Sequence, residues 1–334
     1  MSVRFNRRPG ERSEPVELVA VINSYNRKTL LERAIGSLME ALRNAPFESA
    51  VVVFEAGSND GSQEFLEEWG RQYPADPLVI VAPNDERVSF SDGVNAGCAA
   101  AIARFPTCRW LLLYETDNFL EKAEPLCQAI SLLRAEPRLA AAGFTVKRHD
   151  GSFGGYGMRF PSWFSLLAGP NLAGRWNLHR PNDSPWQLTQ DVHWKLCDIV
   201  FTSPLMIRRE AWEQLGGFNA KAFPFSDSDL DWAWRCQEAG WNTAVIASEN
   251  VVHDNLQQPS PGSADRVVDF HRGRLRLLKS HRNSRASALT KPVLFLRHFL
   301  EAISLACRSF SNRSAKDKLA RRQQMLRSVW TDYS

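Results

Sequence analysis

The sequence predicts an α/β domain in which a largely parallel sheet carries helices on both faces, and three observations support this class. Between residues 16 and 117, short apolar runs alternate with segments of helical spacing, which is the order of parallel strands joined by helical crossovers. Three of these runs end in polar or acidic residues, where open parallel sheets place their ligands. The 334 residues are 44% hydrophobic and 23% charged, so wholesale disorder is excluded.

The first elements follow from the apolar pattern. We predict buried strands over 16–22, 50–54, 78–81 and 110–114, because each is a short apolar run that ends at a polar segment. Helices are predicted over 29–43, 63–73 and 93–104. Residues 1–15 are charged and contain Pro and Gly, and we predict that they form a flexible arm.

The pattern becomes irregular after residue 150. Residues 150–197 are rich in Gly, Pro, Trp, Asn and His, and we interpret them as an insertion or loop on the acceptor side of a functional site. A strand over 198–207, a turn over 215–218, a helix opened by an acidic cluster and a strand over 243–246 follow. The folded domain is expected to extend over 16–282.

Residues 283–334 are predicted to form a basic, amphipathic helical tail. Its apolar residues recur at helical spacing, namely Val293, Leu296, Leu300, Ile303 and Cys307. Residues 271–334 contain fifteen Lys and Arg against three acids, a net charge of +12, whereas residues 1–270 carry −8. This asymmetry favours a polyanionic partner, such as an anionic membrane surface or a diphosphate. Packing on its own domain or on a partner subunit is the alternative.

Cysteine usage and hydropathy indicate the compartment. The six Cys are scattered without a CxxC pair, which argues against a zinc site and a disulfide framework. No stretch of eighteen apolar residues occurs, and the first residues lack the apolar core of a secretory signal. We therefore expect a cytoplasmic protein, and binding of the tail to the inner face of the membrane would make it peripheral.

Acidic residues gather at the ends of predicted elements. They are Glu55, the pair Glu115 and Asp117, and the cluster Asp227, Asp229 and Asp231. Two carboxylates after the strand over 110–114 would suit Mg²⁺ or Mn²⁺, and such a metal suits a phosphate ligand. His253 follows a late apolar run and is a candidate third ligand. The opening of a helix also keeps a carboxylate ionised, as a general base requires.

The order of these segments resembles that of family 2 glycosyltransferases, which have the GT-A fold. The matching segments are 19–27 (VAVINSYNR), 54–62 (FEAGSNDGS), 91–97 (SDGVNAG), 112–117 (LLYETD), 217–241 and the pair Val252-His253. The resemblance covers about residues 16–282 and is to bacterial rhamnosyl- and polysaccharide-type transferases. Glu55 and Glu115 stand where the family usually has Asp, and Ser228 replaces the Glu before the expected base.

The resemblance implies an inverting transferase of the hexosyl or deoxyhexosyl class, which uses a nucleotide-sugar donor. Asp117, with His253, would hold the divalent metal on the donor diphosphate, and Asp229 would take the proton from the acceptor hydroxyl. Arg272 and Arg274 are further candidates for phosphate contacts. The residues expected to bind the donor are Ser24, Tyr25, Arg27, Glu55, Asp60, Asn95 and Glu115.

The acceptor is expected to be a saccharide or a lipid-linked saccharide of cell-envelope polysaccharide or glycolipid synthesis. Aromatic faces bind sugar rings through apolar contacts. The acceptor-side candidates are therefore Trp163, Trp176, Trp186 and Trp194, together with Asp231.

Other functions fit parts of the sequence. A nucleotidyltransferase would share the nucleotide-binding sheet and the acidic metal site, but the loop NSYNRK lacks the usual Gly-rich phosphate-binding composition. A glycosidase would need paired carboxylates flanking a cleft. A non-catalytic sugar- or polyanion-binding protein on the same fold is compatible with the altered acids and the basic tail. No nucleic-acid partner is expected, because the basic run over 313–327 lacks interleaved aromatic residues.

Overall fold

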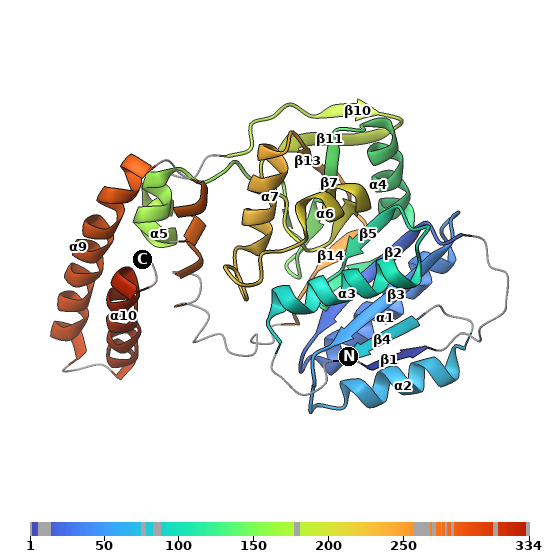
Figure 1. The fold of residues 1–334 in the computed structure, drawn as a ribbon, viewed down its shortest axis with the longest axis horizontal. Helices are drawn as coiled ribbons and strands as arrows, with labels where there is room; N and C mark the ends of the chain where they lie inside the picture. The colour runs from blue at the N-terminus through green and yellow to red at the C-terminus, as the bar shows by residue number, and fades with distance from the viewer. Residues whose placement is uncertain are drawn as a thin grey trace.

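The computed structural model describes residues 2–5, 15–74, 78–82, 88–176, 181–256, 268, 272–274, 276–277, 279–281, 284–309 and 313–331. These residues form an α/β domain around a ten-stranded sheet, with helices at the C-terminal end of the chain (Figure 1). The predicted fold class and the helical tail are confirmed.

The parallel half of the sheet comes from the first third of the chain. Its strands lie in the order β4-β3-β2-β5 and all run in one direction. They are β2 (Leu18–Ser24), β3 (Ser49–Glu55), β4 (Leu78–Ala82) and β5 (Trp110–Leu113). The connecting helices are α1 (Lys28–Arg43), α2 (Ser62–Gln72) and α3 (Phe90–Arg104). Because the strands are parallel, their carboxyl ends meet at one edge of the sheet.

The other half of the sheet is mixed. β12 (Leu205–Arg208) runs antiparallel between β5 and β7 (Leu139–Phe144), with Leu205 opposite Leu113. β13 (Asn242–Ile246) lies parallel to β7, and β11 (Val192–Cys197) and β10 (Gln187–Thr189) complete this edge in antiparallel order. The segment from β5 to β13 thereby extends the same sheet rather than forming a second domain.

A small second sheet brings a late segment back to the end of β5. Its strand order is β6-β14-β8-β9, and its members are β6 (Asn118–Leu120), β14 (Val251–His253), β8 (Val146–Lys147) and β9 (Phe153–Gly154). The register of β14 on β6 places His253 opposite Asn118. His253 is therefore next to the Glu115–Asp117 turn.

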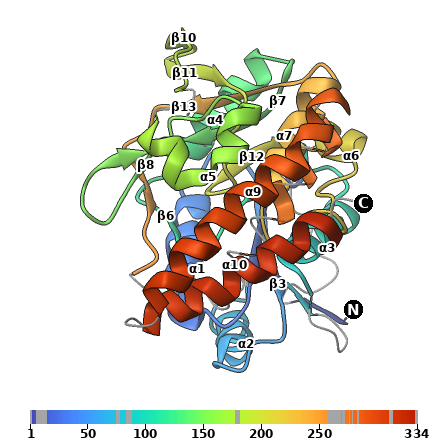
Figure 2. The same ribbon diagram turned by 90° about the vertical axis from the view of Figure 1, so that its left-hand side faces the viewer.

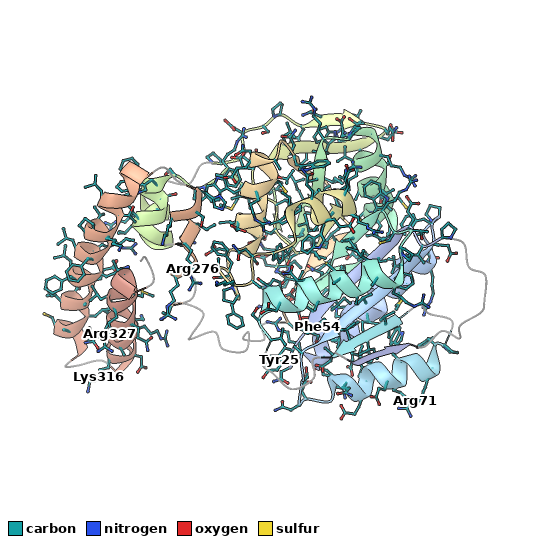
Figure 3. All side chains as sticks on the ribbon, in the orientation of Figure 1. Tyr25, Phe54, Arg71, Arg276, Lys316 and Arg327 are labelled. Atoms are coloured by element: carbon teal, nitrogen blue, oxygen red, sulfur yellow. The ribbon has the colours of Figure 1, made fainter. Side chains whose placement is uncertain are left out.

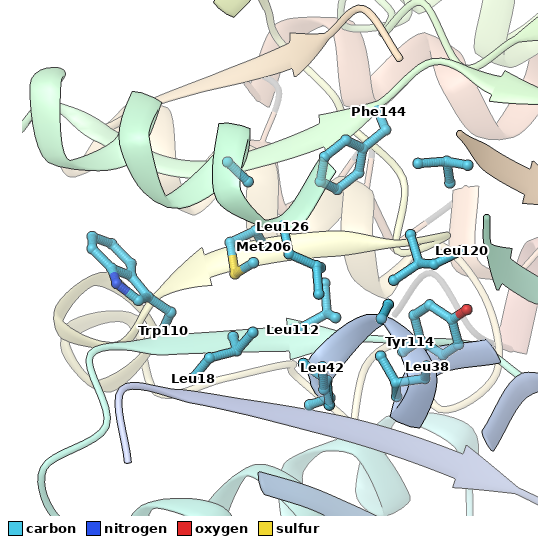
Figure 4. Packing of buried hydrophobic residues seen from close by; sticks show 14 of the residues in the cluster. Leu18, Leu38, Leu42, Trp110, Leu112, Tyr114, Leu120, Leu126, Phe144 and Met206 are labelled. Carbon is cyan, nitrogen blue, oxygen red and sulfur yellow. The ribbon is translucent and has the colours of Figure 1, made fainter. Parts of the chain in front are cut away.

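Two hydrophobic cores lie on opposite faces of the large sheet, since successive residues of a strand point to opposite sides. Leu18 and Ile22 of β2 pack into a core with α1, α2 and α4 (Glu124–Ala135) (Figure 4). Val19 and Val21 pack into the other core with α3, α6 (Arg209–Leu215) and α7 (Ser228–Glu238). Burial on both faces explains why these strands are continuous apolar runs in the sequence.

Three predicted segments differ from the structure. Residues Ser2–Phe5 form β1, which pairs antiparallel with β4, so this part of the expected arm extends the sheet; residues 6–14 lie outside the described residues. The strand expected over 198–207 is limited to β12. The irregular segment 150–197 contains α5 (Trp163–Arg175) and β11 of the large sheet. β11 has alternating buried and exposed residues at its start. Because its polar residues resemble those of the neighbouring loop, the sequence has no clear apolar run from which to predict this strand.

The tail consists of α9 (Ser284–Ser309) and α10 (Arg313–Thr331), which pack on each other. α5 contacts α9, and Figure 2 shows α9 and α10 side by side across one face of the molecule. Within the described part of the chain, no helix is both long enough and apolar enough to cross a membrane.

Candidate active site

The loops that follow β2, β3 and β5 form one wall of the candidate site. The parallel pairing aligns Ser24 at the end of β2 with Glu55 at the end of β3, and the turn after β5 carries Glu115 and Asp117. Ser24 is 1% exposed, and within the described structure its hydroxyl has no hydrogen-bond partner. Tyr25, the next residue, is exposed, and Figure 3 labels it at this end of the sheet.

Asp60 connects the loops that form this wall. Its carboxylate accepts hydrogen bonds from the backbone N–H of Lys28 (2.8 Å) and of Ser62 (3.1 Å) and from the Ser62 hydroxyl (2.6 Å). Lys28 begins α1 and Ser62 begins α2, so Asp60 satisfies the N-termini of two helices. Burial raises its pKa, but these hydrogen bonds outweigh that effect and lower it overall. The structure places Asp60 in support of the loops.

Glu55 has a similar supporting geometry. Its carboxylate is 1% exposed and accepts from the backbone N–H groups of Gly57 (3.0 Å) and Ser58 (2.9 Å). Ser58 in turn accepts from the backbone N–H of Asn26 through its hydroxyl (2.8 Å). The loops after β2 and β3 therefore hold each other, and Glu55 orders the second of them.

Asp117 is the centre of the charged part of the site. Arg27 Nη1 lies 3.4 Å from Asp117 Oδ2, and His253 Nδ1 lies 3.6 Å from Asp117 Oδ1. His253 Nδ1 also lies 3.1 Å from Asn118 Oδ1. Asp117 Oδ1 is buried and has no hydrogen-bond partner among the described residues. The structure thus brings together three residues predicted for donor and metal binding.

Glu115 faces the other side of the turn, into a pocket. The Thr202 hydroxyl donates to Glu115 Oε1. Burial raises the pKa of Glu115 above its ordinary value, and repulsion from the negative charge of Asp117 raises it further. The pocket has a volume of about 420 Å³, and Glu115 and Asp229 both line it.

Asp229 reaches this pocket from the first turn of α7. Burial raises its pKa to about 7, and the negative charges of Asp227 and Glu115 contribute. Its Oδ1 accepts from the Leu230 backbone N–H at 2.9 Å. Asp227 precedes α7 with a left-handed backbone (φ 59°). Burial raises the pKa of Asp227 to about 6, although Arg274 opposes this. A carboxylate with a pKa near 7 suits a general base.

Asp231 does not face the pocket. Its carboxylate is 3% exposed and is held by Arg235 Nε at 2.8 Å and by His281 Nε2 at 2.9 Å. His281 Nδ1 lies 3.0 Å from Glu238 Oε1, and the imidazole stacks on Trp234. The expectation that Asp231 lies on the acceptor side is therefore corrected, because its oxygens are used in a buried network that anchors α7.

Asn95 likewise bonds to the protein backbone. Its side-chain amide donates to Phe218 O (2.8 Å) and accepts from Phe218 N (2.8 Å). These two bonds fix the turn after α6 to α3. The structure thus gives Asn95 a supporting place beside the site.

The four tryptophans predicted for the acceptor side do not converge. Trp194 is 3% exposed and donates to Thr189, so it belongs to the core. Trp163 donates to Thr290 at 2.9 Å and joins α5 to α9. Trp176 and Trp186 are exposed, but neither lines the pocket. The segment has few other large apolar residues, so Trp163 and Trp194 are used for packing.

Other residues, which the sequence did not single out, form the pocket wall. Phe90, Met158, Ile199, Phe201 and Phe225 line it, together with Arg274, which the sequence had suggested for phosphate contacts. Phe201 and Phe225 are 40% and 44% exposed. Phe225 stands two residues before Asp227, and this proximity to the acidic cluster was the one available signal. Apart from the carboxylates and a few other polar residues, the pocket lining is largely apolar.

The donor set around Asp117 fits a divalent cation. A buried carboxylate oxygen without a partner and a nearby imidazole are ligands that Mn²⁺ accepts. Among the described residues, no three His, Cys, Asp or Glu side chains gather into a complete metal site. Asp117 and His253 would therefore supply two ligands, and the remaining positions suit diphosphate oxygens and water, as is usual for Mg²⁺ sites.

Residues 15–266 match the family described as Glycosyltransferase like family 2. The chain is also similar to N-acetylglucosaminyl-diphospho-decaprenol L-rhamnosyltransferase of two Mycobacterium tuberculosis strains, CDC 1551 / Oshkosh and ATCC 25618 / H37Rv. Each is 25% identical over 279 residues, which is 76% of this chain and 81% of the relative.

Two solved structures are similar in fold. The first is mannosyltransferase PcManGT from Pyrobaculum calidifontis in complex with GDP-Man and Mn²⁺, with a TM-score of 0.50, 14% identity, and coverage of 95% of this chain and 86% of that one. The second is GalNAc-T7 with UDP, GalNAc and Mn²⁺, with a TM-score of 0.51, 12% identity, and coverage of 77% and 48%. Both similarities concern the GT-A architecture alone.

Proposed function

The chain belongs to the Glycosyltransferase like family 2, and from this premise we propose that it transfers a hexosyl or deoxyhexosyl group from a nucleoside-diphosphate sugar to an acceptor hydroxyl with inversion at the anomeric carbon. One observation carries the proposal. Glu115, from the turn that bears Asp117, and Asp229 line the same pocket although they come from distant parts of the chain. A donor held at Asp117 would thus present its sugar to the carboxylate of Asp229.

Asp229 is the proposed general base. Its carboxylate takes the proton of the acceptor hydroxyl, and the acceptor oxygen forms a bond to the anomeric carbon. The bond from that carbon to the diphosphate oxygen breaks, and its electron pair leaves with the nucleoside diphosphate. The pKa of about 7 supports this role, because a base with that pKa is about half ionised at neutral pH and accepts a proton readily.

The donor would lie along the loops after β2, β3 and β5. Ser24 and Tyr25 would face the nucleoside, Arg27 would approach the diphosphate, and Glu55, Asp60 and Asn95 would hold the loops in shape. Asp117 and His253 would hold Mn²⁺ or Mg²⁺, which when bound neutralises the charge of the leaving diphosphate. Arg274 lines the pocket and would add positive charge there.

The proposed acceptor is a lipid-linked saccharide of cell-envelope synthesis. The apolar wall with Phe201 and Phe225 supports an acceptor with an apolar part or a sugar face against aromatic rings. The name of the mycobacterial relatives specifies a saccharide on a diphospho-lipid, and this substrate class is proposed here by analogy. Such an acceptor would be used at a membrane surface, facing the cytoplasm.

The test is a transfer assay with a panel of nucleotide sugars, Mn²⁺ and a short-chain N-acetylglucosaminyl-diphospho-lipid. We expect one donor to be consumed and the product to show inverted anomeric configuration by NMR. The Asp229→Asn variant should bind this donor and fail to transfer it. Consumption of no donor by a folded protein, or retention of configuration, would overturn the proposal.

A further inference from the structure

A stripe of apolar residues on α9 is exposed in the folded chain. We define the α9 stripe as Leu289, Val293, Leu296, Leu300 and Ile303, spaced three or four residues apart, so that they lie on one side of the helix. Each of them is between 41% and 60% exposed. Phe299 is 47% exposed beside them and stacks on Phe295. Single exposed leucines are common, but a continuous stripe of this length indicates a binding surface.

The contacts of α9 with its own chain use the other side of the helix. Leu294 is 2% exposed and packs with Leu167 of α5 and Val329 of α10. Arg297 Nη1 donates to Leu167 O, and Arg322 of α10 lies 2.8 Å from the buried His298. α5 and α10 thereby fix the orientation of α9 with its stripe outward.

The C-terminal segment that carries the stripe is strongly basic. Residues 271–334 carry fifteen Lys and Arg against three acids. On α10, the exposed cations include Lys316, Lys318 and Arg327, and Figure 3 labels two of these on the helix that lies beside α9. This charge complements an anionic surface and opposes the close approach of a second copy of the same hairpin. Anionic lipid headgroups supply such a surface directly above an apolar layer.

Apolar residues are also exposed on α5, next to the hairpin. α5, which contacts α9, exposes Phe164 (66%) and Trp176 (62%). Ser165, next to Phe164, lines the pocket that contains Asp229.

We propose that the α9 stripe binds the surface of an anionic phospholipid bilayer, with the helix lying parallel to the membrane plane and the basic residues of α10 contacting lipid headgroups. α9 contains 26 residues, a length of about 39 Å. An amphipathic helix has one apolar and one polar side. It lies in the membrane–water interface with its apolar side buried at the boundary between the lipid headgroups and the acyl chains. Binding through this stripe depends on exposed apolar residues and charge alone and is independent of the transferred sugar.

The experiment is flotation of the full-length protein with two kinds of vesicle, phosphatidylglycerol mixed with phosphatidylcholine, and phosphatidylcholine alone. We expect binding to the anionic vesicles, weakened by salt, and about tenfold weaker binding to the neutral ones. The double variant Leu296→Glu/Leu300→Glu should lose about tenfold or more in affinity. Leu188→Glu is the matched control, because Leu188 is 61% exposed on β10 and should leave binding unchanged.

Two results would overturn the proposal. One is absence of binding to anionic vesicles at low salt. The other is a dimer in light scattering that the double variant converts to a monomer, which would make the stripe an interface between copies. Transfer to a water-soluble acceptor serves as the independent readout: the double variant should retain it, so loss of vesicle binding is separable from failure of the proposed activity.

Discussion

His281 Nε2 lies 2.9 Å from Asp231 Oδ1, two residues after the proposed base in α7. The same imidazole lies 3.0 Å from Glu238 Oε1 near the end of α7. His281, which precedes the C-terminal hairpin, thereby bridges two residues that are about two turns apart on the helix that carries Asp229. Gly273 of that segment lies so close to Asp227 that an added Cβ would come within 2.7 Å of Asp227 Oδ2.

Removing His281 should make the protein less stable, most strongly at mildly acidic pH. Burial lowers the pKa of His281, but the hydrogen bonds with Asp231 and Glu238 outweigh this and raise it above 6.5. A raised folded-state pKa stabilises the folded state below the unfolded pKa, and this contribution disappears as pH rises through the folded pKa. At about pH 6, His281→Ala should lower the free energy of unfolding by about 1–3 kcal/mol, measured by urea denaturation.

The control for this variant is His193→Ala, since His193 is exposed on β11. It should leave stability unchanged at every pH. A His281→Ala effect that grows with rising pH would contradict the charged state assigned to His281.

Activity should depend on the ionisation of Asp229. Because its pKa is about 7, kcat/KM should fall about tenfold per pH unit well below that value and level off above it. Asp227→Asn removes a negative charge that raises the pKa of Asp229, so the inflection should move to lower pH. Asp191→Asn, in the exposed turn before β11, should keep the wild-type profile.

Asp229→Asn should abolish catalysis and stabilise the fold at alkaline pH. Loss of the base is expected to reduce kcat by about 10²–10⁴. The folded-state pKa of Asp229 is raised, so stability is lost as pH rises from the unfolded pKa to about 7. An amide avoids this loss, which is complete above about 7. Thermal unfolding at about pH 8 should therefore show a higher Tm for the variant. If the folded variant had a Tm equal to or lower than that of the wild type, ionisation of Asp229 would not destabilise the folded protein, and the prediction would be wrong.

Asp117 should control metal-dependent donor binding. In wild type, a nucleoside diphosphate should raise the Tm more with Mn²⁺ than with EDTA, since ligand binding stabilises the folded state. Asp117→Asn should remove this difference, and His253→Ala should reduce it. Asp150→Asn, an exposed residue away from the site, should preserve it. Full Mn²⁺ dependence in Asp117→Asn would exclude this residue as a ligand.

Two adjacent glycines offer a matched test of the Asn95 anchor. Gly216 and Gly217 both have positive φ (76° and 73°), but only at Gly217 would a Cβ meet a neighbour, 2.7 Å from Asn95 Oδ1. Gly216→Ala should cost about 1–2 kcal/mol for the left-handed backbone. Gly217→Ala should cost about 1–3 kcal/mol more, because it also displaces Asn95 from Phe218. Equal losses in denaturation would show that the Asn95 contact is unimportant.

Local pattern was sufficient to predict the parallel half of the sheet. Strands such as β3 are buried on both faces, so their apolar runs end where the strand ends. The same logic placed Glu115, Asp117 and Asp229 at element ends, and the structure brings the turn of Glu115 and Asp229 to one pocket. Pairing between distant strands, as of β11 with β13, leaves no local signal, and β11 was therefore assigned to a loop.

Residue type did not predict the role of each site residue. Asp60, Glu55 and Asn95 stand in motifs that suggested ligand contacts, yet their polar atoms bind neighbouring backbone. A polar side chain beside a site has the same sequence signature whether it meets a ligand or holds a loop. His281 was missed for a related reason, because its partners lie 43 and 50 residues away in the chain.

The position of β12 limits how such enzymes can be recombined. β12 lies between β5 and β7, although it follows both in the sequence. A fragment that ends before β12 would leave β5 as an open sheet edge, which favours aggregation. Chimeras that join the parallel half of this sheet to the mixed half of a relative must preserve the ladder in which Leu113 faces Leu205. The two halves are thus exchangeable only across a shared strand interface, and new acceptor specificity is more readily introduced by grafting loops than by swapping halves.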